Sequence, residues 1–181
     1  HGTGGWDNIT VWGESDTVIL EYCQISNGLG KEVAVVGPGQ YRLAAAPNAI
    51  AMGGAILLGA GCKGQIRQCT ISQNGGQGAI SLVDVESVTI AHNTIQENRE
   101  NGIVCLGGCP QIENNLLFYN KKSGIVCRSG NRSLLSQNRC QRNQWAGIVV
   151  QQESQPILQE NAIHGSPNGI VWETSQPWEL G

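Results

Sequence analysis

Carboxylates and a histidine gather in one stretch of the sequence and are its best candidates for acid–base chemistry. Asp84 and Glu86 lie close together, and His92, Glu97 and Glu100 follow soon after. A pair of carboxylates can act as general acid and general base, as in glycoside hydrolysis. These five side chains fall where turns are expected, and we interpret them as solvated surface charge. The sequence therefore assigns no catalytic residue, which favours a protein that is not an enzyme.

A modest basic cluster is formed by Lys121, Lys122, Arg128 and Arg132. The whole chain has 11 Lys and Arg residues against 14 Asp and Glu residues, and its formal net charge is −3. A nucleic-acid-binding surface needs a clear excess of positive charge. No apolar run approaches the roughly 20 residues of a membrane span. We expect neither nucleic acid nor a membrane as a partner.

Seven cysteines, an odd number, are spread through the chain without the spacing of a disulfide framework. Cys105, Cys109 and Cys127 come nearest to a metal-ligand set, but they lack a Cys-x-x-Cys motif and a histidine at ligand spacing. The sequence therefore predicts no metal and no cofactor. Cysteines that look unpaired favour a reducing, cytoplasmic setting, and the localisation is otherwise open.

A glycine followed by aliphatic residues recurs about every 23 residues. This repeat predicts which strands and turns hold the side chains described above. The period is too short for helical repeats or propeller blades, which need about 33 residues or more. Short β-branched runs without a 3.6-residue period instead predict a β-solenoid with three strands in each coil. The repeated segments begin at Gly54, Gly78, Gly102, Gly124, Gly147 and Gly169.

A second signature inside each coil places an asparagine between aliphatic residues. Asparagine tolerates the left-handed backbone of a tight turn, and stacked asparagines can hydrogen-bond along the axis as in cross-β ladders. We interpret this ladder as scaffold and not as a binding site. Its members are Asn93, Asn115, Asn138 and Asn161, with Cys69 and Cys23 at the same position of earlier coils. A closing residue lies five positions beyond the ladder position: Asn74, Asn98, Asn120, Asn143 and Ser166.

The Gly-Ile-Val strand start, the Ile-x-x-Asn-x-Ile core and the closing asparagine resemble the right-handed parallel β-helix repeats of the pectate-lyase-like superfamily. Residues 97–104 and 142–149 are also similar to the repeats of F-box β-helix adaptor proteins. The resemblance implies an all-β, right-handed parallel β-helix. It implies no single function, because the superfamily contains lyases, hydrolases, epimerases, sugar binders and protein-binding adaptors.

A single domain of about seven coils, each of 22–24 residues, is expected over residues 1–181. Residues 8–27 fit an early coil, residues 54–173 fit the regular coils, and residues 174–181 form the C-terminal end. Residues 28–53 fit the repeat badly and are interpreted either as an irregular excursion or as a degenerate coil. We expect the chain to be part of a longer polypeptide.

Three neighbouring positions after each glycine are mostly apolar, although alternation along a strand prevents all three from pointing inward. The flanking columns contain alanine and cysteine and suit the interior. We therefore expect the middle column to face outward as an apolar stripe, which is typical of an interface. Folding of residues 28–53 over the stripe is the alternative. The column is Ile56, Ile80, Val104, Val126, Val149 and Val171.

Two polar columns are expected on the outer faces of the other two strands of each coil. Neither column places two carboxylates on neighbouring coils, as a lyase or hydrolase would need. The first is Glu21, Arg67, Ala91, Glu113, Ser136 and Gln159, and the second is Ser26, Ser72, Gln96, Phe118, Gln141 and His164.

The sequence favours a non-catalytic interaction module, which binds a protein partner or a second copy of itself through the apolar stripe. The alternative is a carbohydrate-binding or polysaccharide-degrading β-helix, a lyase or a hydrolase, that has part of its site outside this chain. Phe118, Tyr119 and Trp145 are the residues expected to contact a glycan, because aromatic rings offer a flat apolar face with a polar edge nearby.

Overall fold

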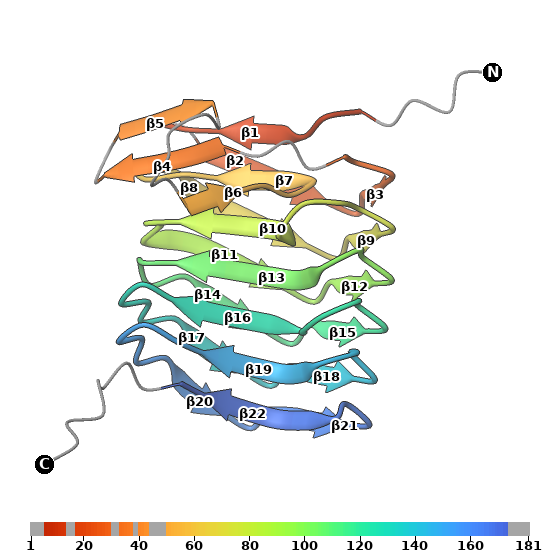
Figure 1. Ribbon diagram of the computed structural model, residues 1–181. Helices are drawn as coiled ribbons and strands as arrows, with labels where there is room; N and C mark the ends of the chain where they lie inside the picture. The colour runs from red at the N-terminus through yellow and green to blue at the C-terminus, as the bar shows by residue number, and fades with distance from the viewer. Residues whose placement is uncertain (1–5, 14–16, 30–32, 38–39, 44–49, 174–181) are drawn as a thin grey trace, which may run out of the picture.

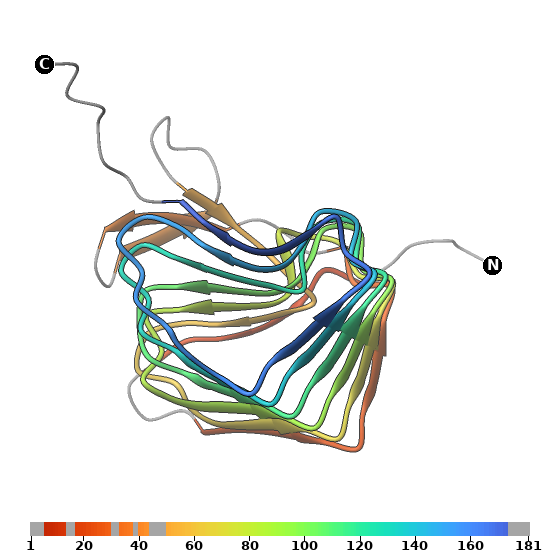
Figure 2. The same ribbon diagram turned by 90° about the horizontal axis from the view of Figure 1, so that it is seen from below.

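Short strands follow one another around a common axis in the computed structural model. It describes residues 6–13, 17–29, 33–37, 40–43 and 50–173, with the backbone alone for the strands between 33 and 52. Each coil contributes strands that pair in parallel with those of the next coil (Figure 1). Viewed along the axis, three parallel sheets surround a single core (Figure 2). None of the described segments is a helix long and apolar enough to cross a membrane.

Sheet A has seven strands, and sheets B and C have six each. Sheet A contains, in spatial order, β1 (Ile9–Val11), β7 (Ile56–Leu58), β10 (Gly78–Val83), β13 (Asn101–Leu106), β16 (Ile125–Arg128), β19 (Ala146–Val150) and β22 (Asn168–Trp172). Sheet B contains β2 (Thr17–Glu21), β8 (Lys63–Arg67), β11 (Ser87–Ala91), β14 (Gln111–Glu113), β17 (Leu134–Ser136) and β20 (Ile157–Gln159). Sheet C contains β3 (Gln24–Ser26), β9 (Thr70–Ser72), β12 (Thr94–Gln96), β15 (Leu116–Phe118), β18 (Arg139–Gln141) and β21 (Ala162–His164).

The pairing register of sheets B and C confirms both polar columns expected from the sequence. Because strand residues alternate between the two faces, every second residue of each sheet points into the core. These inward residues, almost all aliphatic, form one continuous buried cluster along the axis. The cluster is the apolar burial that a single coil could not achieve alone.

Residues 28–53 make no coil of the helix, because β1 pairs directly with β7. Between β3 and β7 the chain instead forms a small antiparallel sheet of β4 (Val33–Gly37), β5 (Gln40–Leu43) and β6 (Ile50–Met52), in the order β5-β4-β6. Figures 1 and 2 both show this sheet on the outer side of sheet A, beside the first coils. Of the two alternatives that the sequence left open, the structure shows an excursion that contains strands.

The asparagine ladder is confirmed. Asn115 Oδ1 accepts hydrogen bonds from the backbone N–H and from the Nδ2 of Asn93, both at 3.0 Å. Its own Nδ2 donates to the Ile90 carbonyl oxygen at 2.8 Å and to Asn138 Oδ1 at 3.0 Å. Every polar atom of this buried amide has a partner, which is the condition for burying it without a large cost.

The closing asparagines form a second ladder of the same design. Asn98 Nδ2 donates to Asn120 Oδ1 at 2.9 Å and to the Ile71 carbonyl oxygen at 3.2 Å. The last rung is the hydroxyl of Ser166, which accepts from the backbone N–H of Asn143 at 3.1 Å. Both asparagine columns are therefore scaffold.

Left-handed backbone occurs one residue before each ladder position, and the expectation that the asparagines themselves adopt it is wrong. The φ angle is 56° at His92, 54° at Glu97 and 55° at Tyr119, and all three residues are exposed. The physical reason is that the exposed residue adopts the left-handed backbone of the bend. The asparagine that follows it can then point inward and form hydrogen bonds with the neighbouring coils.

Candidate functional site

The first coils of sheet A differ by one residue from the alignment expected for the apolar stripe. Ile80 pairs with Ile103 and with Ile56. Ile56 and Ile80 lie in the inner core, so the prediction that they belong to an outward stripe is wrong. The cause is that Gly78 pairs with Asn101 and not with the next repeat glycine. A slip of one residue exchanges the two faces of a strand.

The other members of the stripe do face outward, but they are not exposed. Val104, Val126 and Val149 are 1%, 6% and 0% exposed and belong to an outer cluster separate from the core. The chain therefore covers the outer face of sheet A itself. The outward column, in register order, is Leu57, Ser81, Val104, Val126, Val149 and Val171.

Two contacts show how the covering begins. Ser81 Oγ donates to the Gly53 carbonyl oxygen at 2.8 Å, so the chain that leaves β6 lies against the outer face of β10. Trp12 packs against the outer cluster, and its ring lies so close to Gly59 that an added Cβ there would come within 2.3 Å of it. The contact of Gly53 favours the alternative in which residues 28–53 fold over the stripe, and the contact of Trp12 shows that the first coil also contributes to the cover. The exposed patch on which a protein interface was predicted is absent from the described part of this column.

A polar concavity of about 530 Å³ lies where the chain turns from sheet C into sheet A. Lys122 and Glu100 form an ion pair in its wall. Arg128 reaches from the end of β16 to the residue before β10, where its guanidinium donates to Gln77 Oε1. Burial lowers the pKa of Arg128, but a guanidinium stays charged at neutral pH. The lining residues are Gly76, Gln77, Glu100, Asn101, Lys122 and Arg128.

Backbone hydrogen bonds extend this wall by one further coil. The Lys122 N–H donates to the Glu100 carbonyl oxygen at 3.0 Å, and the Trp145 N–H donates to the Lys122 carbonyl oxygen at 2.8 Å. Glu100, Lys122 and Trp145 thus occupy equivalent positions in three successive coils. The Trp145 side chain is 39% exposed, so the polar wall is continued by an accessible indole ring.

A family model for the right-handed β-helix region matches residues 7–178. The chain belongs to the right-handed β-helix family. The fold class predicted from the sequence, an all-β right-handed parallel β-helix with an asparagine ladder, is confirmed. A search of the curated proteins and a search of the solved structures gave no match. Family membership therefore establishes the architecture of this β-helix, and its function must be argued from the site.

Phe118 and Tyr119 lie on the sheet C side of the same corner of the β-helix. Their rings meet edge to face with centroids 5.4 Å apart. The Arg142 guanidinium lies 5.9 Å from the centroid of the Tyr119 ring, and Arg142 Nη1 donates to Tyr119 Oη at 2.6 Å. One face of Tyr119 is therefore already occupied. Of the three aromatic residues predicted to contact a glycan, Trp145 adjoins the polar concavity, because it is bonded to Lys122 of the preceding coil.

The acid–base candidates of the sequence are separated by the β-helix. Asp84 and Glu86 line a smaller concavity of about 260 Å³ between sheets A and B. His92 lies in the turn between sheets B and C, and Glu97 and Glu100 lie in the turn between sheets C and A. Burial raises the pKa of Asp84, although its side chain stays accessible. Within the described residues, no three His, Cys, Asp or Glu side chains are grouped to hold a metal ion.

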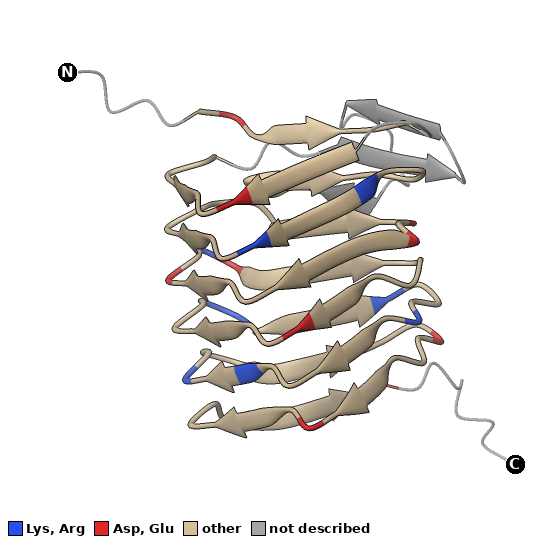
Figure 3. Ribbon diagram, turned by 180° about the vertical axis from the view of Figure 1, so that it is seen from behind, with Lys and Arg blue, Asp and Glu red and all other residues tan. Residues whose placement is uncertain are grey.

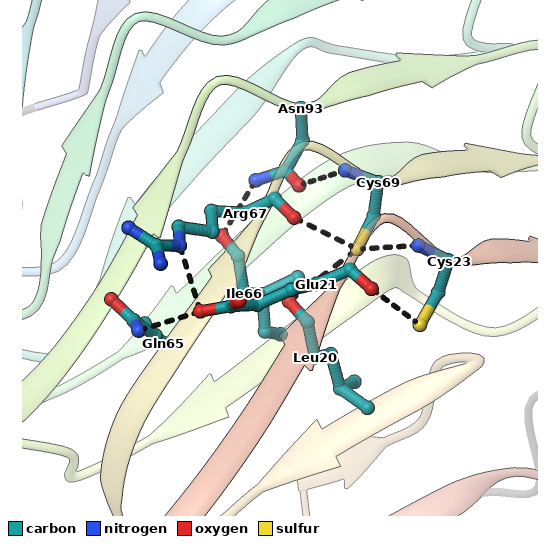
Figure 4. Close-up of polar contacts among 8 residues, drawn as sticks. All are labelled: Leu20, Glu21, Cys23, Gln65, Ile66, Arg67, Cys69 and Asn93. Carbon is teal, nitrogen blue, oxygen red and sulfur yellow. Dashed lines mark hydrogen bonds and ion pairs between the residues drawn. The ribbon is translucent and has the colours of Figure 1, made fainter.

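Charged residues on the outer face of sheet B do not form a patch of one sign (Figure 3). The best-defined pair is Glu21 and Arg67 on neighbouring coils, where Arg67 Nε donates to Glu21 Oε1 at 2.8 Å. Gln65 Nε2 donates to the same oxygen at 2.9 Å (Figure 4). Ion pairs this exposed contribute about 0–1 kcal/mol, so we interpret this cluster as surface structure.

Proposed function

We propose that this β-helix binds a glycan without cleaving it, at the polar concavity beside Trp145. The observation that carries the proposal is the continuous wall formed by the ion pair of Glu100 and Lys122 and by the exposed indole of the next coil. A sugar ring has an apolar face of C–H groups and a rim of hydroxyl groups. An indole face matches the first, and fixed amide and charged side chains match the second.

The polar side chains of the concavity are held in place before any ligand arrives. Asn101 Nδ2 donates to the Gln77 carbonyl oxygen at 2.7 Å, and Asn101 Oδ1 accepts the Ser123 N–H at 3.0 Å. Arg128 is fixed by its bond to the Gln77 side chain. Binding a ligand to such groups orders few additional rotamers, which reduces the entropic cost of association.

A binding role without cleavage is supported by the number of carboxylates that line the concavity. Among the described residues of its lining, Glu100 is the one that is acidic, and its carboxylate is paired with Lys122. Glycosidic cleavage by the general acid and base route needs a second carboxylate within about 10 Å across the scissile bond. Asp84 and Glu86 line a different concavity, between sheets A and B.

The main test is a calorimetric titration of the β-helix with a panel of neutral and acidic oligosaccharides. Replacing Trp145 with alanine should weaken binding at least about tenfold, because the stacking surface is lost, which corresponds to about 1.4 kcal/mol. Replacing Lys122 with alanine should weaken it further for acidic members of the panel. The matched control is Tyr22→Ala, which removes an aromatic ring that is 73% exposed at the corner between sheets B and C.

Equal weakening by Trp145→Ala and Tyr22→Ala would place the glycan elsewhere on the surface. Cleavage products in the titrated mixture would show that the protein is an enzyme. Thermal unfolding of both variants, measured alongside, separates a lost contact from a lost fold.

A protein partner, the role that the sequence favoured, stays a second candidate because of the last coil. Ile157, Ile170 and Trp172 are 56%, 50% and 51% exposed there. Ile157 lies on β20 of sheet B, whereas Ile170 and Trp172 both lie on β22 of sheet A. Exposed apolar side chains of this size are typical of protein contacts. Replacing Ile170 and Trp172 with serine should abolish capture of such a partner and leave glycan binding unchanged.

A further inference from the structure

Two cysteines occupy the ladder position in the first two coils, where the later coils have asparagine. The ladder ends at Cys69, whose backbone N–H donates to Asn93 Oδ1 at 2.9 Å. The next contact along the axis is between cysteines: the Cys23 N–H points at Cys69 Sγ, with a distance of 3.5 Å between nitrogen and sulfur (Figure 4). Cys23 Sγ itself lies 3.2 Å from the Glu21 carbonyl oxygen. The N-terminal end of the scaffold is therefore built from a stacked pair of thiols.

The two residues are held one strand spacing apart on both sides. Glu21 pairs with Arg67 in sheet B, and Gln24 pairs with Thr70 in sheet C, so Cys23 and Cys69 occupy equivalent positions. Neighbouring strands are about 4.8 Å apart, and disulfides join Cα atoms about 4.4–6.8 Å apart. Cys23 and Cys69 lie between strands, in the turn from sheet B to sheet C, where the backbone can adjust to the torsion of a disulfide.

A second pair in the same β-helix provides an internal comparison. Cys105 and Cys127 are also paired on neighbouring coils, but both lie inside strands and are 0% exposed. A hydrogen bond to Cys105, together with burial, raises the pKa of the Cys127 thiol well above its usual range. Thiols in that condition do not react. Cys23 is partly exposed and can be reached by a small reagent.

We propose that Cys23 and Cys69 are a disulfide site, oxidised by exchange with a small-molecule disulfide such as oxidised glutathione. The Cys23 thiolate attacks one glutathione sulfur, the glutathione S–S bond breaks, and the first glutathione leaves as a thiolate that takes up a proton. The Cys69 thiolate then attacks the Cys23 sulfur and releases the second glutathione. The protein loses two protons and two electrons in total, and the small disulfide is reduced to two thiols.

The order of attack follows from the surroundings of the two sulfurs. Cys69 is buried, which raises its pKa, whereas Cys23 is partly exposed. Cys69 is therefore the resolving thiol and Cys23 the attacking one. The bond joins the first coil to the second and closes a loop that contains the whole excursion of residues 28–53. It thereby fixes the end of the scaffold where the asparagine ladder has no further rung.

The experiment incubates the native chain with oxidised glutathione, quenches exchange with acid, then denatures, alkylates and maps the peptides by mass spectrometry. The expected result is a cross-link between Cys23 and Cys69, with two fewer alkylated thiols than in the reduced sample. Closing a loop of this length should raise the thermal midpoint by about 10 °C. Cys109→Ser, which removes an exposed thiol, should leave the cross-link and the shift unchanged, whereas Cys23→Ser should remove both.

Three outcomes would overturn the proposal. The first is complete alkylation of both cysteines after incubation, and the second is a stable glutathione adduct on Cys23 without a cross-link. The third is a cross-link between other cysteines. A serine at position 23 keeps the side chain small and polar, so thermal unfolding of the reduced Cys23→Ser variant should match the reduced wild type and show that the fold is intact.

Discussion

Replacing Asn115 with alanine is expected to lower the free energy of unfolding by about 4 kcal/mol, because buried partners lose their hydrogen bonds. The Asn115 carboxamide accepts two bonds from Asn93 and donates one each to Ile90 and Asn138. The backbone N–H of Asn93 would stay buried without an acceptor, and Asn93 Nδ2 would lose one of its two acceptors. Chemical denaturation followed by circular dichroism measures the change.

The matched control for Asn115→Ala is Gln111→Ala in the same coil. Gln111 has the same terminal amide, but its side chain is exposed on the outer face of sheet B. Its replacement should change the free energy of unfolding by less than about 0.5 kcal/mol. Equal effects of the two replacements would contradict the account of the asparagine columns as satisfied, buried scaffold.

Replacing Val104 with glutamate is expected to prevent stable folding, or to lower the free energy of unfolding by more than about 4 kcal/mol. Val104 is 1% exposed in the outer cluster of sheet A, where a carboxylate would be buried among apolar side chains. Size-exclusion chromatography and thermal unfolding would both report the loss.

Val171→Glu is the internal comparison for Val104→Glu. Val171 is in the same outward column, but it lies on the last strand and is only partly buried. Its replacement should cost far less. If Val104→Glu folds as stably as the wild type and merely loses association with another protein, the outer face is open, and the predicted protein interface is restored.

The repeat could be predicted from the sequence because each of its marks has one dominant physical cause. Buried amides are tolerated only when every polar atom is bonded, so a column such as Asn93, Asn115 and Asn138 implies stacking at one strand spacing. The alternation of faces in sheets B and C follows in the same way. Both features are local to a coil and its neighbour.

The face of sheet A could not be predicted in the same way, because glycine is a weak marker of register. Gly78 and Gly102 both precede aliphatic residues, but they occupy different positions in the strand pairing. The neighbouring columns are also apolar, so hydrophobicity did not reveal the slip. Because other parts of the chain cover the outer face, both faces of the sheet are apolar. The alternation of apolar and polar residues then no longer tells which side chains point into the core.

The polar concavity could not be predicted from the sequence either. Gln77 and Arg128 are bonded side chain to side chain although they are 51 residues apart, across two coils. The sequence did single out Trp145, Lys122 and Arg128, but for separate reasons. Only the coil spacing brings the indole beside the ion pair of Glu100 and Lys122.

The most direct test of glycan binding at the polar concavity is nuclear magnetic resonance of the β-helix labelled with nitrogen-15 in its tryptophan indoles. Five tryptophans give five indole signals, which can be assigned by single substitutions. On titration with the oligosaccharide panel, the account predicts a progressive shift of the Trp145 signal, while the Trp12 signal, in the covered outer cluster, stays in place. A shift confined to Trp172, or no shift with any member of the panel, would contradict it.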